Sequence, residues 1–240
     1  ACDPENPKNR RRRCSILVEQ IGAEGTTRVL VDTSPDLREQ LIQVGVKHLD
    51  AILMTHPHAD HTNGIDDVRP LVIHMKRRLD IFMDEPTSEV VRRAFGYIFE
   101  TPEGSNYPPL LIEHRLHAGK PCEVRGAGGA LAAMPILLDH GEIDALGFRF
   151  NNVAYTPDVK RIYPQSEHHL RGLDMWIIDA LRHTTHSTHF SIGDALEMIR
   201  HFKPRHAILT NLSSEVDYGQ LAAEVPENVS VAHDMLSFEI

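Results

Sequence analysis

The spacing of hydrophobic residues predicts that short strands dominate the first third of the chain. Two runs rich in leucine and β-branched residues, 14–20 and 27–33, flank the turn-forming residues Ala23, Glu24 and Gly25, so we expect a β-hairpin. A third run, 50–55, is almost entirely apolar, as expected for a strand that is buried on both faces.

The first helix is predicted directly after the hairpin. Ser34 is the expected N-cap, Pro35 the first helical residue and Gly45 the stop signal. The apolar face of this helix is expected to consist of Leu37, Leu41 and Val44.

Two further helices are indicated by the same kind of spacing. Apolar residues recur at helical intervals in 88–99, which predicts a helix there. Another helix should begin at Ser191, where Asp194 completes a capping box, and it should end before Pro204.

The middle of the chain is patterned less regularly. Residues 101–129 contain four prolines and five glycines, too many for regular elements, so 100–129 is expected to form an irregular excursion. Strands are predicted to resume at 130–138, 146–150, 153–156, 175–179 and 206–210, with Asn151 and Asn152 as a hairpin turn. Because no repeat or linker interrupts the pattern, residues 1–240 are expected to form a single domain.

The composition indicates a globular protein that acts on small molecules. With 240 residues, 41% of them hydrophobic, the chain can bury a core without disulfides, and its three widely spaced cysteines favour a reducing, cytoplasmic location. No run of about 18 apolar residues predicts a membrane span. A net charge of -9 disfavours long nucleic acids, because these are polyanions.

The most unusual feature is the histidine content. The chain has 16 histidines, and His56, His58, Asp60 and His61 form an H-x-H-x-D-H pattern directly after the apolar run 50–55. Histidine is the most common metal ligand in proteins. Where the chain leaves the strand, residues two apart can direct their imidazoles at one centre, whereas Asp60 and His61 can turn toward a second. The pattern therefore predicts a metal-binding loop rather than a merely solvated one.

Further ligands must come from other strand ends, because one loop cannot complete two metal sites. His140 follows the predicted strand 130–138 and Asp158 follows 153–156, so both stand just beyond a strand, as His56 does. Taken alone, His140 could equally be a surface histidine, and Asp158 could be a turn or N-cap residue.

This order of residues resembles the metallo-beta-lactamase fold. The resemblance is carried by the H-x-H-x-D-H after a strand, the later lone His140 and the aspartate after Ala-Tyr-Thr-Pro, and residues 179–182, 186–189 and 208–210 extend it over nearly the whole chain. The sequence is most similar to the branch that contains tRNase Z and the cyclic ribosyl phosphate phosphodiesterase of phosphonate breakdown. The resemblance implies an α+β protein, a four-layer αβ/βα sandwich of two mixed sheets flanked by helices.

The same resemblance implies a dinuclear metal centre. It assigns the first ion to His56, His58, His140 and Asp158, and the second ion to Asp60, His61 and a bridging Asp158. A histidine usually completes the second site after the last strand, but this chain has Asn211 there. An amide oxygen is a harder and weaker ligand than imidazole, so the second site should bind more weakly and should shift toward Mn²⁺. The expected cofactors are two divalent ions, Mn or Zn.

A metal pair of this kind implies hydrolysis with a metal-bridging hydroxide as the nucleophile. Asp60 would ligate and orient the hydroxide. The resemblance places His189 over the metals, where it would bind substrate and protonate the leaving group, although it could instead be only a neighbour of the helix cap at Ser191. His186 is a weaker candidate for substrate binding. Arg69 could bind a phosphate, or it could form a surface pair with an aspartate.

These features predict a dinuclear metal-dependent hydrolase of a small phosphodiester, such as a cyclic ribose phosphate or a nucleotide. The alternatives are a tRNA 3'-end endonuclease, a lactone or thioester hydrolase, and a non-catalytic metal-dependent ligand-binding module. Only 10–13 and 75–78 are strongly basic, and we expect 10–13 to be a solvated segment, so a small phosphate ester or nucleotide is favoured over a long nucleic acid. No membrane partner is expected, and a homodimer is left open.

Overall fold

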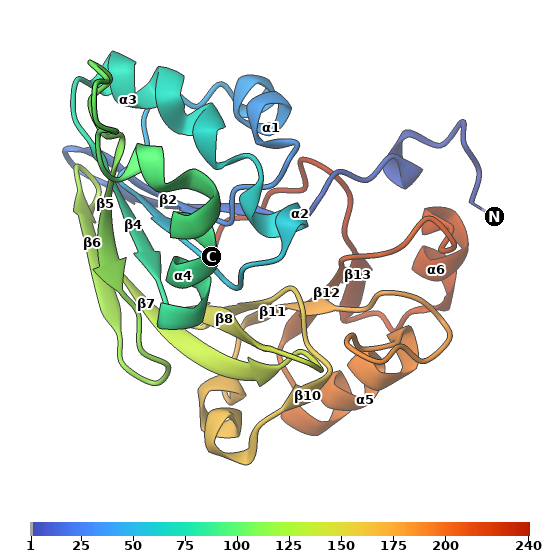
Figure 1. Ribbon diagram of the computed structural model, residues 1–240. Coiled ribbons are helices and arrows are strands. Elements are labelled where there is room, and N and C mark those ends of the chain that lie inside the picture. Colours follow the sequence, from blue (N-terminus) through green and yellow to red (C-terminus); the bar gives the residue numbers. More distant parts are fainter. Residues whose placement is uncertain (1) are drawn as a thin grey trace. The chain divides into compact units, whose positions relative to one another are not determined.

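The computed structural model describes residues 2–240, which divide into two units, each with a mixed β-sheet and helices (Figure 1). The first, termed the N-terminal unit, comprises Arg13–Ala133. The second, termed the C-terminal unit, comprises Met134–Ile240 together with the described residues up to Arg12. The expected pair of mixed sheets flanked by helices is therefore confirmed.

The N-terminal unit contains a five-stranded sheet in the order β1-β2-β3-β4-β5. Strands β1 and β2 are antiparallel, and each later pair is parallel. A separate strand, β6, pairs antiparallel with the start of β7. The elements are β1 (Ile16–Gly22), β2 (Gly25–Val31), α1 (Leu37–Val44), β3 (Ala51–Leu53), α2 (Ala59–Thr62), the 3-10 helix η2 (Ile65–Val68), α3 (Arg69–Met75), β4 (Leu79–Met83), α4 (Glu85–Phe95), the 3-10 helix η3 (Gly96–Ile98), β5 (Leu111–Arg115), β6 (Cys122–Gly126) and β7 (Gly129–Asp139), which continues into the C-terminal unit.

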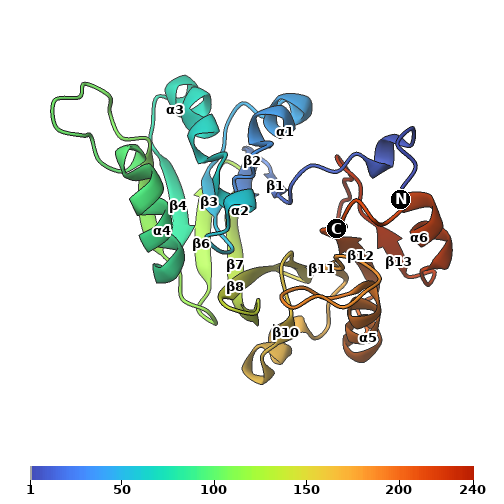
Figure 2. The same cartoon turned by 45° about the vertical axis from the view of Figure 1, so that its right-hand side comes forward.

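One apolar cluster joins the helices of the N-terminal unit to its sheet. Leu37 of α1, Leu71 of α3 and Val91 of α4 pack with Ile52 of β3 and Ile81 of β4. Figure 2 shows these three helices grouped beside the sheet. All three residues of β3 are buried, so the polar residues that follow this strand, beginning with Thr55 and His56, start at the edge of the apolar cluster.

The C-terminal unit contains the strand order β10-β7-β8-β9-β11-β12-β13. Strands β7 to β9 are antiparallel neighbours, whereas β9, β11, β12 and β13 are parallel. The elements are the 3-10 helix η1 (Pro7–Asn9), the end of β7, β8 (Asp144–Phe150), β9 (Val153–Thr156), β10 (Arg161–Ile162), the 3-10 helix η4 (Pro164–Leu170), β11 (Met175–Asp179), α5 (Ile192–Phe202), β12 (His206–Thr210), α6 (Tyr218–Glu224) and β13 (Val229–Val231).

Both predicted hairpins are confirmed. Gly22 stands opposite Gly25 in the β1–β2 pair, and Phe150 stands opposite Val153 in the β8–β9 pair. Asn151 has φ +50°, the left-handed conformation that asparagine adopts in tight turns. The predicted capping box at the start of α5 is also present.

The predicted start of α1 is wrong. The N-cap is Asp36, and the Ser34 hydroxyl instead accepts from the Asp36 amide and donates to Gln40, two contacts that hold the loop before the helix. Gly45 does end the helix, in the left-handed conformation, with φ +72°. Val44 does not join the apolar face, because its surface is 49% exposed.

Helix α4 begins three residues earlier than the pattern predicted, and the predicted helix ends differently. The Asp84 carboxylate accepts from the Thr87 amide and caps the helix ahead of Glu85. The α-helix ends at Phe95, and Ile98 belongs to η3.

The predicted irregular excursion at 100–129 contains two strands, β5 and β6, which corrects that expectation. Its prolines lie outside them, three before β5 and Pro121 directly before β6. Strand β5 exists because it pairs in register with β4, and β6 because it pairs with β7, contacts that local composition does not encode. The elements α3 and β4 were not predicted either.

The basic run 10–13 is not simply solvated. The Arg11 guanidinium donates to the carbonyls of Ser213 and Val216, and Arg12 forms an ion pair of 2.7 Å with Asp234. These contacts fasten the start of the C-terminal unit to residues more than 200 positions later in the chain.

No helix within residues 2–240 combines the length and apolar character needed to cross a membrane.

Candidate metal centre

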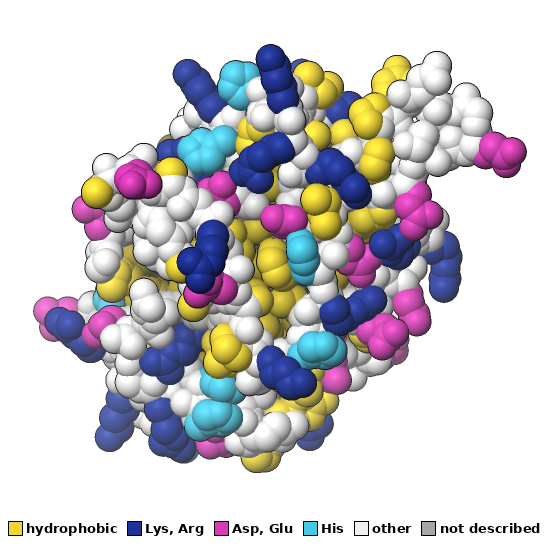
Figure 3. All heavy atoms as spheres, turned by 90° about the vertical axis from the view of Figure 1, so that its left-hand side faces the viewer, with side chains coloured by type: hydrophobic (Ala, Val, Ile, Leu, Met, Phe, Trp, Pro, Cys, Tyr) yellow, Lys and Arg dark blue, Asp and Glu magenta, His cyan; other side chains and the backbone are white. Residues whose placement is uncertain are grey.

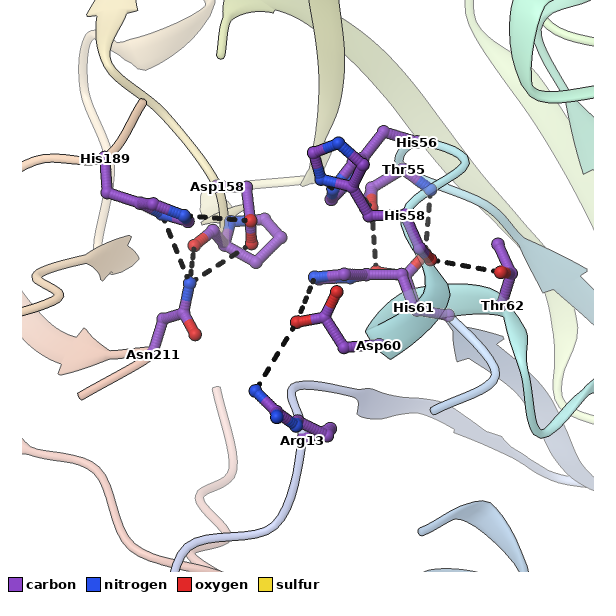
Figure 4. A network of polar contacts seen from close by, with 12 residues as sticks. Arg13, Thr55, His56, His58, Asp60, His61, Thr62, Asp158, His189 and Asn211 are labelled. Atoms are coloured by element: carbon purple, nitrogen blue, oxygen red, sulfur yellow. Dashed lines mark hydrogen bonds and ion pairs between the residues drawn. The ribbon is translucent and has the colours of Figure 1, made fainter. Parts of the chain in front are cut away.

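The H-x-H-x-D-H residues lie where the buried strand β3 turns into α2. His58 is the last extended residue before α2, and Asp60 and His61 belong to its single turn. Nε2 of His56 lies 3.0 Å from Nδ1 of His58, and the rings of His56 and His61 have centroids 4.3 Å apart. The turn from strand to helix thus gathers the predicted ligands of the N-terminal unit, termed the HxHxDH cluster (Figure 4).

A buried carboxylate, Asp32, orients the imidazoles of this cluster through hydrogen bonds to residues of the same loop. Asp32, directly after β2, accepts hydrogen bonds of 2.8 Å each from the Thr55 amide, the Thr55 hydroxyl and Nδ1 of His61. Because the Thr55 hydroxyl gives its proton to Asp32, it accepts from Nδ1 of His56, 2.9 Å away. Both imidazoles therefore hold their proton on Nδ1, so Nε2 is the nitrogen that can bind a metal.

Asp32 itself is fully buried and has φ +64°. Burial raises the pKa of its carboxyl above the ordinary value, and the contacts with His61 and Thr55 act in the opposite direction. A bound cation at the His61 ring would favour the charged carboxylate that the hydrogen bonds require.

Asp60 occupies the outer side of the cluster. Its side chain is 39% exposed, and its Oδ2 lies 3.7 Å from Nη1 of Arg13 and 3.9 Å from Nε2 of His61. The carboxylate therefore stands beside the ligand nitrogen of His61, with an exposed guanidinium on its other side.

A second cluster lies in the C-terminal unit and consists of His140, Asp158 and His189, termed the HDH cluster. Each residue offers one ligand atom, and these atoms all lie within 4.8 Å of one another. Oδ2 of Asp158 is 3.5 Å from Nε2 of His140 and 3.7 Å from Nε2 of His189. His140 follows β7 and Asp158 follows β9, as the sequence predicted, so two strands of one sheet that are separated only by β8 bring residues 18 positions apart together.

The outer nitrogens of both HDH histidines contact oxygen atoms. Nδ1 of His140 lies 2.7 Å from the Thr188 carbonyl, and Nδ1 of His189 lies 2.9 Å from Oδ2 of Asp179. A carbonyl and a carboxylate only accept, so both histidines donate from Nδ1 and direct Nε2 at Asp158.

Asp179 is fully buried at the end of β11. Burial raises the pKa of its carboxyl to about 7, while the hydrogen bond from His189 acts against that rise. Oδ2 also accepts from the Val159 amide, but Oδ1 has no hydrogen-bond partner within residues 2–240. An orphaned carboxylate oxygen behind an imidazole is stabilised when a cation binds the far side of that imidazole.

Asn211 lies beside the HDH cluster in the left-handed conformation, with φ +58°. Its amide nitrogen donates to the Pro157 carbonyl at 3.1 Å and to Oδ1 of Asp158 at 3.3 Å. The same nitrogen is 3.5 Å from Nδ1 of His189. Figure 4 shows this side chain turned toward Asp158 and His189.

Two of the three predicted substrate residues, Arg69 and His186, have protein partners. The Arg69 guanidinium donates to both oxygens of Asp66, at 2.6 and 3.3 Å, which is the aspartate pair that the sequence left open as its alternative role. Tyr97 donates to the same carboxylate at 3.2 Å. His186 lies beside His189, with ring centroids 5.2 Å apart, and burial together with His189 lowers its pKa.

The sequence analysis gave no role to Asp32, Thr55 or Asp179. The available signal was their place, because each stands at the carboxyl end of a buried strand, as the predicted ligands His56 and Asp158 do. The donor set as a whole consists of imidazole nitrogens and carboxylate oxygens, which suits zinc and other divalent first-row ions. The residues of both clusters therefore fit divalent metals.

Comparison with known proteins gives the family. A model of the beta-lactamase superfamily domain matches residues 27–210, which include residues of both clusters. A crystal structure of a diphosphatase from the PhnP family is 34% identical with a TM-score of 0.87, covering 98% of this chain and 87% of that one.

Two curated relatives are similar over shorter parts of their own length. An octanoyltransferase of Porphyromonas gingivalis is 29% identical over 239 residues, 98% of this chain and 46% of that protein. A ribonuclease Z of Bradyrhizobium is 29% identical over 149 residues, 60% of this chain and 46% of that protein. The chain thus spans about half the length of these relatives. It belongs to the beta-lactamase superfamily and has the metallo-beta-lactamase fold, with similarity to the PhnP family and to ribonuclease Z.

Proposed function

We propose that this chain hydrolyses a small phosphodiester, such as a cyclic ribose phosphate or a nucleotide, with the help of two divalent metal ions. The observation that carries the proposal is the pair of ligand clusters, in which the Nδ1 atoms of His56, His61, His140 and His189 are committed to oxygen acceptors. The similarity to a diphosphatase of the PhnP family supports phosphate chemistry. The proposed ligands are His56, His58, Asp60, His61, His140 and Asp158, and they suit either zinc or manganese.

Two divalent ions, when bound, supply an activated water and neutralise charge on the phosphate. The chain's own residues then act by position. Asp32 and Thr55 keep the imidazoles of His61 and His56 in the tautomer that presents Nε2. Asp60, the exposed carboxylate of its cluster, can accept a hydrogen bond from the attacking water and orient it.

Arg69 is the proposed contact for a phosphate oxygen. Its bidentate pair with Asp66 holds the guanidinium in one orientation, and Tyr97 braces that carboxylate. A phosphate would have to compete with Asp66 for the guanidinium donors. Substitution of Arg69 should therefore change KM more than kcat.

The proposal is tested by loading the protein with Zn²⁺ or Mn²⁺ and measuring hydrolysis of a 2',3'-cyclic nucleotide and of bis-p-nitrophenyl phosphate. We expect His58→Ala and His140→Ala, one from each cluster, to lower turnover by about 10²-fold or more. The exposed His74 on α3 supplies the control, and His74→Ala should keep wild-type activity. Faster hydrolysis of a lactone than of any phosphodiester, or full turnover in either cluster variant, would contradict the proposal.

A ribonuclease activity is the second candidate, favoured by the similarity to ribonuclease Z. Because ribonuclease Z is similar to this chain, the net charge of -9 is not sufficient to exclude RNA as a substrate. On the face shown in Figure 3, Lys and Arg side chains lie among acidic and histidine side chains rather than in one continuous stripe. We therefore rank RNA below a small ester, and cleavage of a tRNA precursor faster than of a cyclic nucleotide would reverse that order.

We also propose a cytoplasmic location. No disulfide joins the cysteines within residues 2–240, as expected for a reducing compartment.

A further inference from the structure

We propose that Nε2 of His189 is a metal ligand, together with His140 and Asp158, and that Asn211 is chemically unsuited to the ligand role expected of it. The inference deepens the proposed metal centre and rests on it. It changes the role of His189 from the expected proton donor to a ligand, and it changes Asn211 from the expected ligand to a support for Asp158.

The tautomer of His189 is the first argument. Its Nδ1 donates to the fully buried Asp179 carboxylate, 2.9 Å away. Carboxylate–imidazole pairs of this kind are typical of metal-bound histidines, because they fix the ring and increase the basicity of Nε2. His140 uses the Thr188 carbonyl in the same way.

The second argument is the spacing of the three donor atoms. Nε2 of His140 and Nε2 of His189 lie 3.5 and 3.7 Å from the same Asp158 oxygen, too far for good hydrogen bonds. Two ligands on one tetrahedral zinc are about 3.4 Å apart, given bonds of about 2.1 Å. Lone-pair atoms that face one another at this separation are stabilised by a cation between them.

The third argument is the orientation of Asn211. Its amide nitrogen donates to two acceptors, the Pro157 carbonyl and Oδ1 of Asp158. Turning the amide over would place its oxygen against both of these oxygens, which is repulsive. Asn211 therefore presents a donor to Asp158, and a donor cannot bind a cation.

A proton-donating role would require a proton on Nε2 of His189, whereas a ligand role requires Nε2 without one. With Nδ1 committed to Asp179, Nε2 of His189 carries a proton only when the ring is an imidazolium. A donor would affect the hydrolysis of esters with poor leaving groups and leave metal binding intact, whereas a ligand would affect metal binding itself.

The experiment measures metal affinity and stoichiometry of the metal-depleted protein by competition with a chelating dye. We expect His189→Ala to lower the affinity for one ion at least tenfold. His186→Ala is the matched control, because its ring lies 5.2 Å from that of His189 on the same loop, and it should bind both ions as the wild type does. Wild-type affinity for both ions in a folded His189→Ala variant would overturn the inference.

A second variant gives a readout that does not depend on activity. His189→Cys loaded with Co²⁺ should show a thiolate-to-cobalt charge-transfer band that is absent from the wild type, which has the same three native cysteines, and from His186→Cys. If circular dichroism shows that His189→Ala does not fold, the charge-transfer band of His189→Cys replaces the affinity measurement as the test. Absence of that band overturns the inference. The proposed function is judged separately: it fails when the metal-loaded wild type hydrolyses no phosphodiester, whatever the variants at residue 189 bind.

Discussion

In both clusters the orientation of a histidine depends on one buried carboxylate. A fully buried carboxylate, Asp32 in one unit and Asp179 in the other, holds the Nδ1 proton of a histidine. This fixes the tautomer before any ligand arrives, so Nε2 is directed at the proposed metal. The sequence motif identified the histidines, but it did not identify the carboxylates behind them.

Asp32→Asn should lower metal affinity by about 10- to 100-fold. Asparagine tolerates the left-handed backbone at φ +64°, so the change removes the charge and the acceptor pair without straining the chain. One amide oxygen cannot satisfy His61 and both Thr55 donors. Metal titration of the depleted protein tests this, with Asp67→Asn on η2 as the control. Equal affinities in the two variants would show that Asp32 has no such role.

At the scale of elements, signals confined to a few residues were read correctly. The capping box of α5 and the two-residue hairpin turns depend only on neighbours in sequence. The predicted start of α1 was wrong, because the Ser34 hydroxyl donates a hydrogen bond to the Gln40 side chain and does not cap the helix. Strands β5 and β6 were missed since pairing partners, rather than composition, create them.

The loop before the first helix also passes close to Gly64, next to α2, and this gives a test of packing. A Cβ at Gly64 would lie 1.9 Å from the Ser34 carbonyl oxygen, whereas Gly45 has nothing within 4 Å and only its φ of +72° to preserve. We expect Gly45→Ala to cost about 1–2 kcal/mol of unfolding free energy, from the left-handed backbone alone. Gly64→Ala should cost more, through forced movement of backbone. Urea unfolding of both variants measures the difference, and equal losses would contradict it.

At the scale of the whole molecule, contacts between distant parts of the chain complete the C-terminal unit. The Asp217 carboxylate accepts from the amides of Asp3 and Gln220 and from the Asn9 side chain. These hydrogen bonds, the first from Asp3, lower the pKa of Asp217 to about 2. The start of the chain is thereby fastened to α6.

The low pKa of Asp217 sets the sign of a pH effect. Its ordinary value is about 3.9, so the folded state favours the charged form and gains stability above that pH. The gain is lost as pH falls toward about 2. Asp217→Asn should therefore be less stable than the wild type at pH 6, and the difference should shrink on acidification. Urea unfolding at pH 6, 4 and 3 tests this, and a difference that does not change with pH would exclude a charge effect.

The sequence by itself determined the features that depend on near neighbours. These are the hairpins, the α5 cap, and the positions of the HxHxDH residues after β3 and of His140 and Asp158 beyond β7 and β9. That these residues bind metals, and that the chain is a single domain, stay predictions. Only the tertiary structure decided which atom each side chain presents. Asp32 reaches His61 across 29 positions, and Asn211 reaches Asp158 across 53. The reason is physical: a residue's type is written in the sequence, but its hydrogen-bond partner, its tautomer and the orientation of its amide depend on groups that packing brings together.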